Sequence, residues 1–136
     1  KVGIKVKLRT LPRTTHFANI LAGKTDFYML GWSEGTFDSA RELTMLARTP
    51  DPKRGYGAWN AGAYSDPKLD ELLDKSAEIV DLKERAEILK EANREAMNTI
   101  AAIPFHYQAD IYGVSKEVNF TPRADKWFIA KEISFK

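Results

Sequence analysis

Residues 30–38 read Leu-Gly-Trp-Ser-Glu-Gly-Thr-Phe-Asp, a glycine-containing loop that brings together an indole, a hydroxyl and two carboxylates. The apolar run before the loop, residues 26–30, predicts a buried strand. In α/β folds, ligands bind at polar loops that follow the carboxyl ends of strands. We therefore expect Trp32 and its neighbours to line a ligand site. The alternative interpretation is a surface loop around a packed tryptophan.

The residues before this loop predict a strand, a helix and a second strand. Apolar residues alternate with basic ones over residues 3–10, which is typical of a half-buried strand with a solvated basic face. A short helix is expected to be capped by Thr14 or Thr15 and to stop at Gly23. The second strand covers residues 26–32. Tight connections between these elements predict a βαβ unit with a parallel strand pair.

Three helices are predicted after the loop, each with apolar residues at helical spacing. Their expected N-caps are Asp38 or Ser39, Ser65 and Asp81, and the last helix should run to about Ile100. A further apolar strand is expected after Pro104, followed by a C-terminal segment with short strands. The predicted fold class is α/β.

Composition restricts the classes of function. The 136 residues fit one domain or a fragment, 43% are hydrophobic, and no apolar run is long enough to span a membrane. The sequence has no cysteine, which excludes disulfides, thiol nucleophiles and Cys-ligated metals within it. The basic residues from Lys1 to Arg13 have no aromatic residues between them for base stacking, so we do not expect nucleic-acid binding. The start at Lys1-Val2-Gly3, without an initiator methionine, leads us to expect a fragment.

Catalytic signals are weak. The chain has two histidines and lacks the serine-elbow, zinc-helix and phosphate-loop motifs. A triad of Ser33, His106 and Asp38 has no spacing that supports it. Acidic residues over 70–78 are interpreted as a solvated helix face, because no histidine joins them as a metal ligand. We expect no enzyme, no catalytic residue, no metal and no cofactor.

Several short motifs follow one another in a characteristic order. They are Gly31-Trp32 with Asp38, then Asn60, Tyr64, Pro67, Asp70, Leu72 and Leu73, then Asp81 with Arg85, then Ile103-Pro104-Phe105. Their order and spacing resemble the C-terminal part of the family 5 extracellular solute-binding proteins. These are the peptide, oligopeptide and nickel receptors of ABC importers, and the resemblance covers nearly the whole chain.

The resemblance implies the C-terminal lobe of a periplasmic binding protein type II-like fold. Residues 1–105 would belong to the ligand-binding lobe, and residues 106–136 would return towards the first lobe. The implied partners are a small-molecule or peptide ligand, a membrane permease and a missing N-terminal lobe. The implied location is periplasmic or extracellular, with a lipid anchor as one form. Alone, such a fragment would expose an apolar edge and could self-associate.

The resemblance also implies which residues contact the solute. Trp32 matches the family's cleft tryptophan, and Asp38 matches an acid that Pro often follows, although Ser39 stands in that place here. Peptide-binding members carry an acid for the peptide's α-amino group where this chain has Gly35. The loss of this carboxylate–ammonium pair weakens the case for a plain peptide with a free N-terminus, unless Glu34, one residue earlier, takes its place. The alternatives to a plain peptide are a modified peptide, a sugar, an opine or another small solute. The candidate contacts are Trp32, Ser33, Glu34, Gly35, Asp38 and Tyr107.

Two other classes of function remain open. A stand-alone interaction module would bind a protein partner through Tyr56, in the loop over residues 49–57, and Trp59, just after it. A small hydrolase would need His106 and Asp38 for turnover. A solute receptor fits the residues better than either, because its ligand would be buried between lobes without a covalent step.

Overall fold

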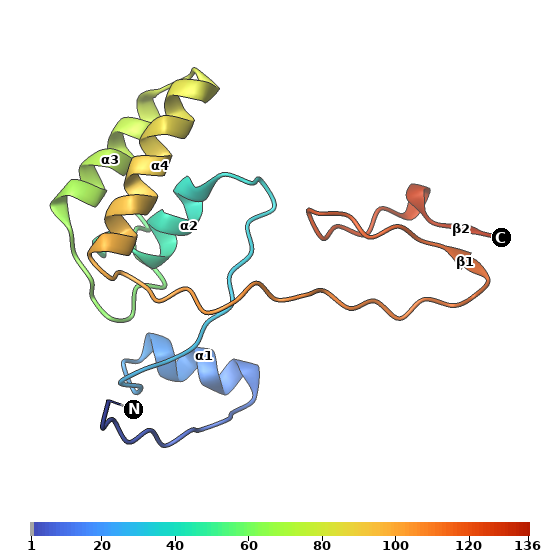
Figure 1. The fold of residues 1–136 in the computed structure, drawn as a ribbon, viewed down its shortest axis with the longest axis horizontal. Coiled ribbons are helices and arrows are strands. Elements are labelled where there is room, and N and C mark those ends of the chain that lie inside the picture. Colours follow the sequence, from blue (N-terminus) through green and yellow to red (C-terminus); the bar gives the residue numbers. More distant parts are fainter. Residues whose placement is uncertain (1) are drawn as a thin grey trace.

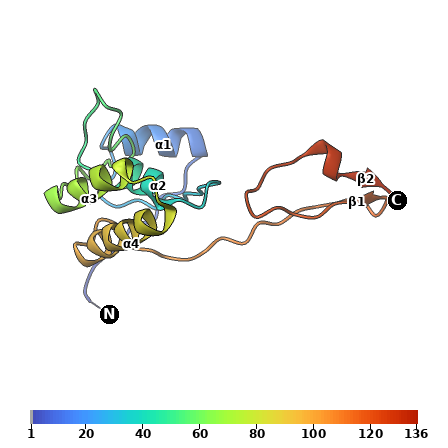
Figure 2. The same cartoon turned by 90° about the horizontal axis from the view of Figure 1, so that it is seen from above.

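The computed structural model describes residues 2–136, in which helices predominate and the strands are short. In Figure 1, α2, α3 and α4 pack side by side, and α1 lies below them. The chain then leaves α4 along an extended path to a C-terminal hairpin, which stands apart from the four helices in the view from above (Figure 2). The elements are α1 (Arg13–Leu21), α2 (Ser39–Leu46), α3 (Pro67–Glu78), α4 (Leu82–Asn98), β1 (Val118–Asn119), η1 (Ala130–Glu132) and β2 (Ser134–Phe135).

The hydrophobic core lies between α2, α3 and α4. Helix α3 contributes Leu69, Leu72 and Leu73, whose spacing of three and four residues places them on one buried face. Helix α4 contributes the fully buried Ala92 and Ala96, whose small side chains let the two helices approach closely. Each buried leucine stabilises the fold by about 2 kcal/mol. These three helices are therefore the stable platform on which the loop of residues 30–38 ends.

Aspartates cap all three platform helices. The side chains of Asp38, Asp66 and Asp81 accept hydrogen bonds from backbone N–H groups of the first turns of α2, α3 and α4. A carboxylate at this position also complements the partial positive charge of the helix N-terminus. The predictions for Asp38 and Asp81 are confirmed. The prediction for Ser65 is wrong, because Pro67 takes the first helical position and Asp66 directly precedes it.

Helix α1 starts earlier than predicted. It begins at Arg13, directly after Pro12, and no side chain caps it. Thr14 and Thr15 lie inside the helix and are not caps, because Pro12, with φ −54° and ψ 143°, ends the extended chain one residue earlier. Its end is as expected, since Gly23 adopts the left-handed conformation with φ +63° that terminates many helices.

The predicted βαβ unit is not formed. Residues 3–10 and 26–32 have no strand pairing, and the sheet found within residues 2–136 pairs β1 with β2 in antiparallel fashion. A strand needs a neighbour for its N–H and C=O groups. The alternating apolar side chains of residues 2–8 are 77–87% exposed, so the strand pattern is present without a partner. In coarse terms the chain is a mixed structure of helices with a short two-stranded sheet.

Residues 102–114 form a second extended segment without strand pairing. The strand expected after Pro104 is not formed, because no neighbouring strand pairs with the backbone of this segment. The side chains of Ile103, Phe105 and Ile111 are exposed. The predicted boundary between residues 105 and 106 lies inside this segment. Beyond it, the rings of Tyr112, Phe120 and Phe128 pack with centroid distances of 5.4–5.8 Å and hold the hairpin together.

Candidate ligand-binding loop

The indole of Trp32 is half-buried at the start of the loop and is not part of the helical core. Its ring lies 6.5 Å from that of Trp59 in an edge-on arrangement, and Trp59 in turn packs against Phe17 of α1 at 5.3 Å. The Nε1 atom of Trp32 is covered and has no hydrogen-bond partner among the described residues. An indole N–H can only donate, so this atom lacks an acceptor.

An ion pair lies beside Trp32. Nη1 of Arg41 donates to Oε2 of Glu34 at 2.8 Å, and the guanidinium of Arg41 lies 6.0 Å from the Trp32 ring centroid. The side chain of Glu34 is only 12% exposed. Burial raises the pKa of Glu42, one residue beyond Arg41, and repulsion from Glu34 raises it further. Arg41 therefore neutralises the loop carboxylate, and a second carboxyl stands close by.

Asp38 closes the loop and is fully engaged within the protein. Its Oδ1 accepts the backbone N–H of Ala40 at 2.8 Å, and its Oδ2 accepts hydrogen bonds from Nε and Nη2 of Arg85. Nη1 of Arg85 also donates to the carbonyl of Ser76 at the end of α3. The structure thus gives Asp38 a role in fixing the loop to the helices. These contacts give Arg85 a structural role at the same place.

Gly35 faces a part of the chain that the sequence did not connect with the loop. A side chain at this position would place its Cβ 3.7 Å from the carbonyl oxygen of Asp125 and 3.9 Å from Nε1 of Trp127. The tip of the C-terminal hairpin therefore lies against the loop, and both figures of the fold show this approach. Trp127 lies in the C-terminal segment, for which the sequence predicts only short strands. Nothing in its sequence neighbourhood indicates that the two segments meet.

The remaining two candidates differ in position. Ser33 is exposed within the loop, next to Trp32, and stays available for hydrogen bonding. Tyr107 lies on the extended segment, and its side chain is fully exposed. The structure therefore does not bring Tyr107 into the half-buried cluster around Trp32.

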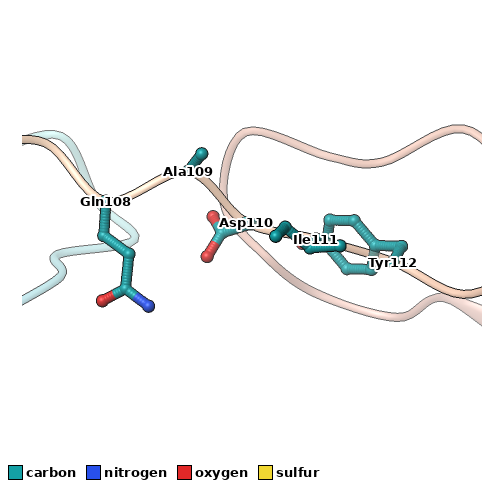
Figure 3. Close-up of a pocket in the computed structure, with 5 residues that line it drawn as sticks. All are labelled: Gln108, Ala109, Asp110, Ile111 and Tyr112. Carbon is teal, nitrogen blue, oxygen red and sulfur yellow. The ribbon is translucent and has the colours of Figure 1, made fainter.

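Two shallow concavities occur elsewhere on the described chain. One, of about 350 Å³, is lined by the consecutive residues Gln108 to Tyr112 (Figure 3). The other, of about 420 Å³, lies inside the hairpin next to Phe120 and Phe128. In Figure 3 the side chains of Gln108 and Ala109 point to opposite sides of the backbone, as in any extended chain. Neither concavity includes Trp32.

The two histidines contact groups other than Ser33 and Asp38. His16 Nε2 lies 3.0 Å from the carbonyl oxygen of Met29, and His106 packs against Phe105 on the extended segment. Asp38 is held by Arg85, so the triad considered with Ser33 is not assembled. Residues 2–136 contain no group of three or more His, Cys, Asp or Glu residues arranged to hold a metal ion. Over the same residues, no helix has both the length and the apolar character needed to cross a bilayer.

Comparisons with protein-family models, with curated proteins and with solved structures found no match to this chain. The resemblance to family 5 solute-binding proteins therefore stays a prediction from the sequence motifs. Function is inferred below from the chain's own residues and their geometry.

Proposed function

We propose that this chain is the C-terminal, ligand-binding lobe of a solute receptor that serves an ABC importer, and that it binds its solute without a covalent step. The observation that carries this proposal is the indole N–H of Trp32, which is covered yet has no acceptor among residues 2–136. An unpaired buried donor costs about 1–3 kcal/mol. A ligand oxygen reaches Nε1 only when the loop shifts to uncover this atom, and the hydrogen bond then recovers the cost and favours binding at the loop.

The fixed ends of the loop support the same proposal. Asp38 and Arg85 tie its far end to the platform helices, and Trp59 supports its near end. A binding group held by such contacts loses little conformational freedom when the ligand arrives. Ser33 and the loop backbone are free to add hydrogen bonds to the solute.

The two unpaired extended segments are where the other lobe of the proposed receptor would pack. Residues 2–10 and 102–114 expose apolar side chains at alternate positions, as strands do that await neighbours. In the proposed receptor, strands of the N-terminal lobe and its connections cover these segments and supply the second wall of the cleft. The permease then docks on the closed receptor at the periplasmic or extracellular face of the membrane, with a lipid anchor as one means of attachment. Without these neighbours, the same segments favour self-association.

The alternative of a protein-interaction module depended on Tyr56 and Trp59 contacting a partner, and both rings pack within the chain. The ring of Tyr56 is covered by the guanidinium of Arg48, which lies 3.8 Å from its centroid. Trp59 packs between Phe17 and Trp32. Both aromatic residues therefore already have partners within the chain.

The test uses ligand-dependent thermal stability. Small molecules released from the denatured, freshly purified full-length receptor, with both lobes, are identified by mass spectrometry, and peptides, opines and sugars are screened by thermal shift on the same protein. A true ligand at 100 times its Kd should stabilise the protein by about 2.7 kcal/mol. Trp32→Phe, which keeps an aromatic ring and removes the donor, should weaken binding about fivefold to tenfold. The matched variant Trp59→Phe should change affinity less. No response to any solute would contradict the proposal.

A further inference from the structure

One ion pair ties the loop over residues 31–37 to the neighbouring helix. Nη1 of Arg41, on α2, donates to Oε2 of Glu34 at 2.8 Å. Among residues 2–136, this is the one hydrogen bond that joins residues 31–37 to another element. The guanidinium of Arg41 also lies over the ring of Trp32. We call this pair the Glu34–Arg41 latch.

Both flanks of the loop are held by contacts of their own. On the near side, Nε2 of His16 lies 3.0 Å from the carbonyl oxygen of Met29. On the far side, Asp38 is bound by Arg85. Between these two points, Gly31 has no neighbouring atom within 4 Å of the position that a Cβ would take. The middle of the loop can therefore rotate at Gly31 while both flanks stay in place.

The observed position of the loop carries two energetic costs. Nε1 of Trp32 is covered and has no acceptor in the described part of the chain. Phe37 has a φ of +56°, in the left-handed region, where a bulky side chain is strained. Its ring is 74% exposed, so packing does not offset this strain. A loop that opens would hydrate the indole N–H and let Phe37 return to a negative φ, and the latch is the polar contact that opposes this opening.

We infer, building on the receptor function proposed above, that the Glu34–Arg41 latch holds the loop in a strained, closed position, and that breaking the pair opens the loop and exposes the Trp32 N–H. Opening comes before contact with the solute, because a covered donor cannot reach a ligand oxygen. The equilibrium between the closed and the open loop then sets the fraction of the protein that is competent to bind. Arg41 favours the closed loop, and Phe37 favours the open one.

The test measures deuterium exchange of the Trp32 indole N–H by NMR in the solute-free, full-length receptor. The loss of one resonance in Trp32→Phe assigns this group. The backbone N–H of Ala92, a fully buried residue of α4, reports unfolding of the helices. Low concentrations of urea should speed exchange at Ala92 and leave exchange at Trp32 nearly unchanged, because a local opening exposes little surface.

Three glutamine variants test the latch. Glu34→Gln and Arg41→Gln each remove one of its charges, and each should speed exchange of the Trp32 N–H about fivefold, as the loss of a partly exposed ion pair predicts. The matched control is Glu42→Gln on the same helix. Glu42 repels Glu34 and makes no hydrogen bond to Arg41 in the part of the chain that the structure describes, so this control should not speed exchange.

Two variants of Phe37 test the strain in the opposite direction. Phe37→Gly and Phe37→Ala both remove the exposed ring, but only glycine adopts a φ of +56° without strain. Exchange of the Trp32 N–H should therefore be about threefold slower in Phe37→Gly than in Phe37→Ala. Any solute found in the screen should bind Phe37→Gly more weakly than Phe37→Ala by the same factor, because fewer molecules have an open loop.

The outcomes separate this inference from the function on which it rests. The inference is wrong if Glu34→Gln and Arg41→Gln exchange like the unaltered protein, if the two Phe37 variants exchange alike, or if urea speeds exchange at Trp32 and Ala92 equally. None of these results depends on a ligand, so the receptor function is judged by the solute screen alone. If exchange follows the expected pattern and no solute binds, the latch stands and the receptor function is wrong.

Discussion

Arg85 on α4 and Asp38 at the start of α2 form an ion pair in which Nε and Nη2 both donate to one oxygen, Oδ2, at 3.1 and 3.0 Å. The other oxygen of Asp38 caps α2 through the N–H of Ala40. The third donor used by Arg85, Nη1, reaches the carbonyl of Ser76 on α3. One guanidinium therefore links three helices at the point where the candidate loop ends.

Removing this guanidinium should loosen the loop from its platform. We expect Arg85→Ala to lower the free energy of unfolding by about 1–3 kcal/mol, because the Asp38 carboxylate and the Ser76 carbonyl lose charge-assisted hydrogen bonds. Urea denaturation followed by circular dichroism measures this change. The control is Arg94→Ala, at an exposed position on the same helix. Equal destabilisation by the two variants would show that the link to Asp38 contributes nothing.

Gly57 is expected to tolerate no side chain. Its φ is +62°, and a Cβ would lie 2.6 Å from the carbonyl oxygen of Arg48 and 2.8 Å from Cα of Pro50. We expect Gly57→Ala to lower stability by about 2 kcal/mol or more, since backbone atoms must move. Gly55→Ala, at φ +74° in open space, should cost about 1 kcal/mol from the conformation alone. Gly62→Ala meets neither obstacle and should be neutral, and a loss there equal to that at Gly57 would refute the argument.

The raised pKa of Glu42 predicts a dependence of stability on pH. Burial and then repulsion from Glu34 favour the protonated carboxyl in the folded state. Ionised Glu42 therefore destabilises the fold at neutral pH, and this penalty disappears as the pH falls below the unfolded-state value of about 4.3. Glu42→Gln should raise the free energy of unfolding at pH 7 by less than about 1 kcal/mol, because the site is half-exposed, and should have no effect near pH 4.

The control for this titration is Glu71→Gln, at an exposed position on α3. Thermal denaturation from pH 4 to pH 8 compares the two variants with the unaltered protein. A stabilisation by Glu42→Gln that stays constant over this pH range would show that charge is not the cause.

The hairpin tip should lose its order in acid. The side-chain hydrogen bond from Arg123, with a further one from the Trp127 N–H, lowers the pKa of Asp125 to about 2. An acid with a lowered folded-state pKa stabilises the structure above its unfolded value of about 3.9, and this contribution is lost as the pH falls through about 2. The indole N–H resonance of Trp127 should therefore shift between pH 4 and pH 2.

The same experiment with Asp125→Asn provides the comparison. This variant cannot ionise, so its Trp127 resonance should be the same at both ends of the titration. Circular dichroism recorded in parallel distinguishes a change at the hairpin from unfolding of the helices. An identical shift in the variant would assign the transition to another group.

The helices of this protein follow from local sequence. Asp38 and Asp81 stand directly before leucine patterns of helical spacing, and α2 and α4 begin where these residues predict. The information is local, because a cap bonds to N–H groups two or three residues away and an apolar stripe repeats every turn. The predicted N-cap of α3, Ser65, lies one residue before the observed cap, Asp66. Both residue types are good caps, and only the position of Pro67 decides between them.

The strands could not be predicted in the same way. Residues 3–10 and 26–32 have the alternation and apolar character of strands, yet neither is paired within the described chain. Pairing depends on a neighbour that the segment's own sequence does not specify. In contrast, β1 and β2 are only two residues each, and they pair because the rings of Tyr112, Phe120 and Phe128 gather their flanking segments.

The sequence by itself determined the platform helices, the aspartate caps and the aromatic and acidic content of residues 30–38. Only the tertiary structure decided that Asp38 is bound by Arg85, that the Trp32 N–H lacks an acceptor and that Trp127 lies against Gly35. The reason is physical: helix formation depends on neighbours within one or two turns. A site depends on contacts between distant segments, which exist only once the chain has packed.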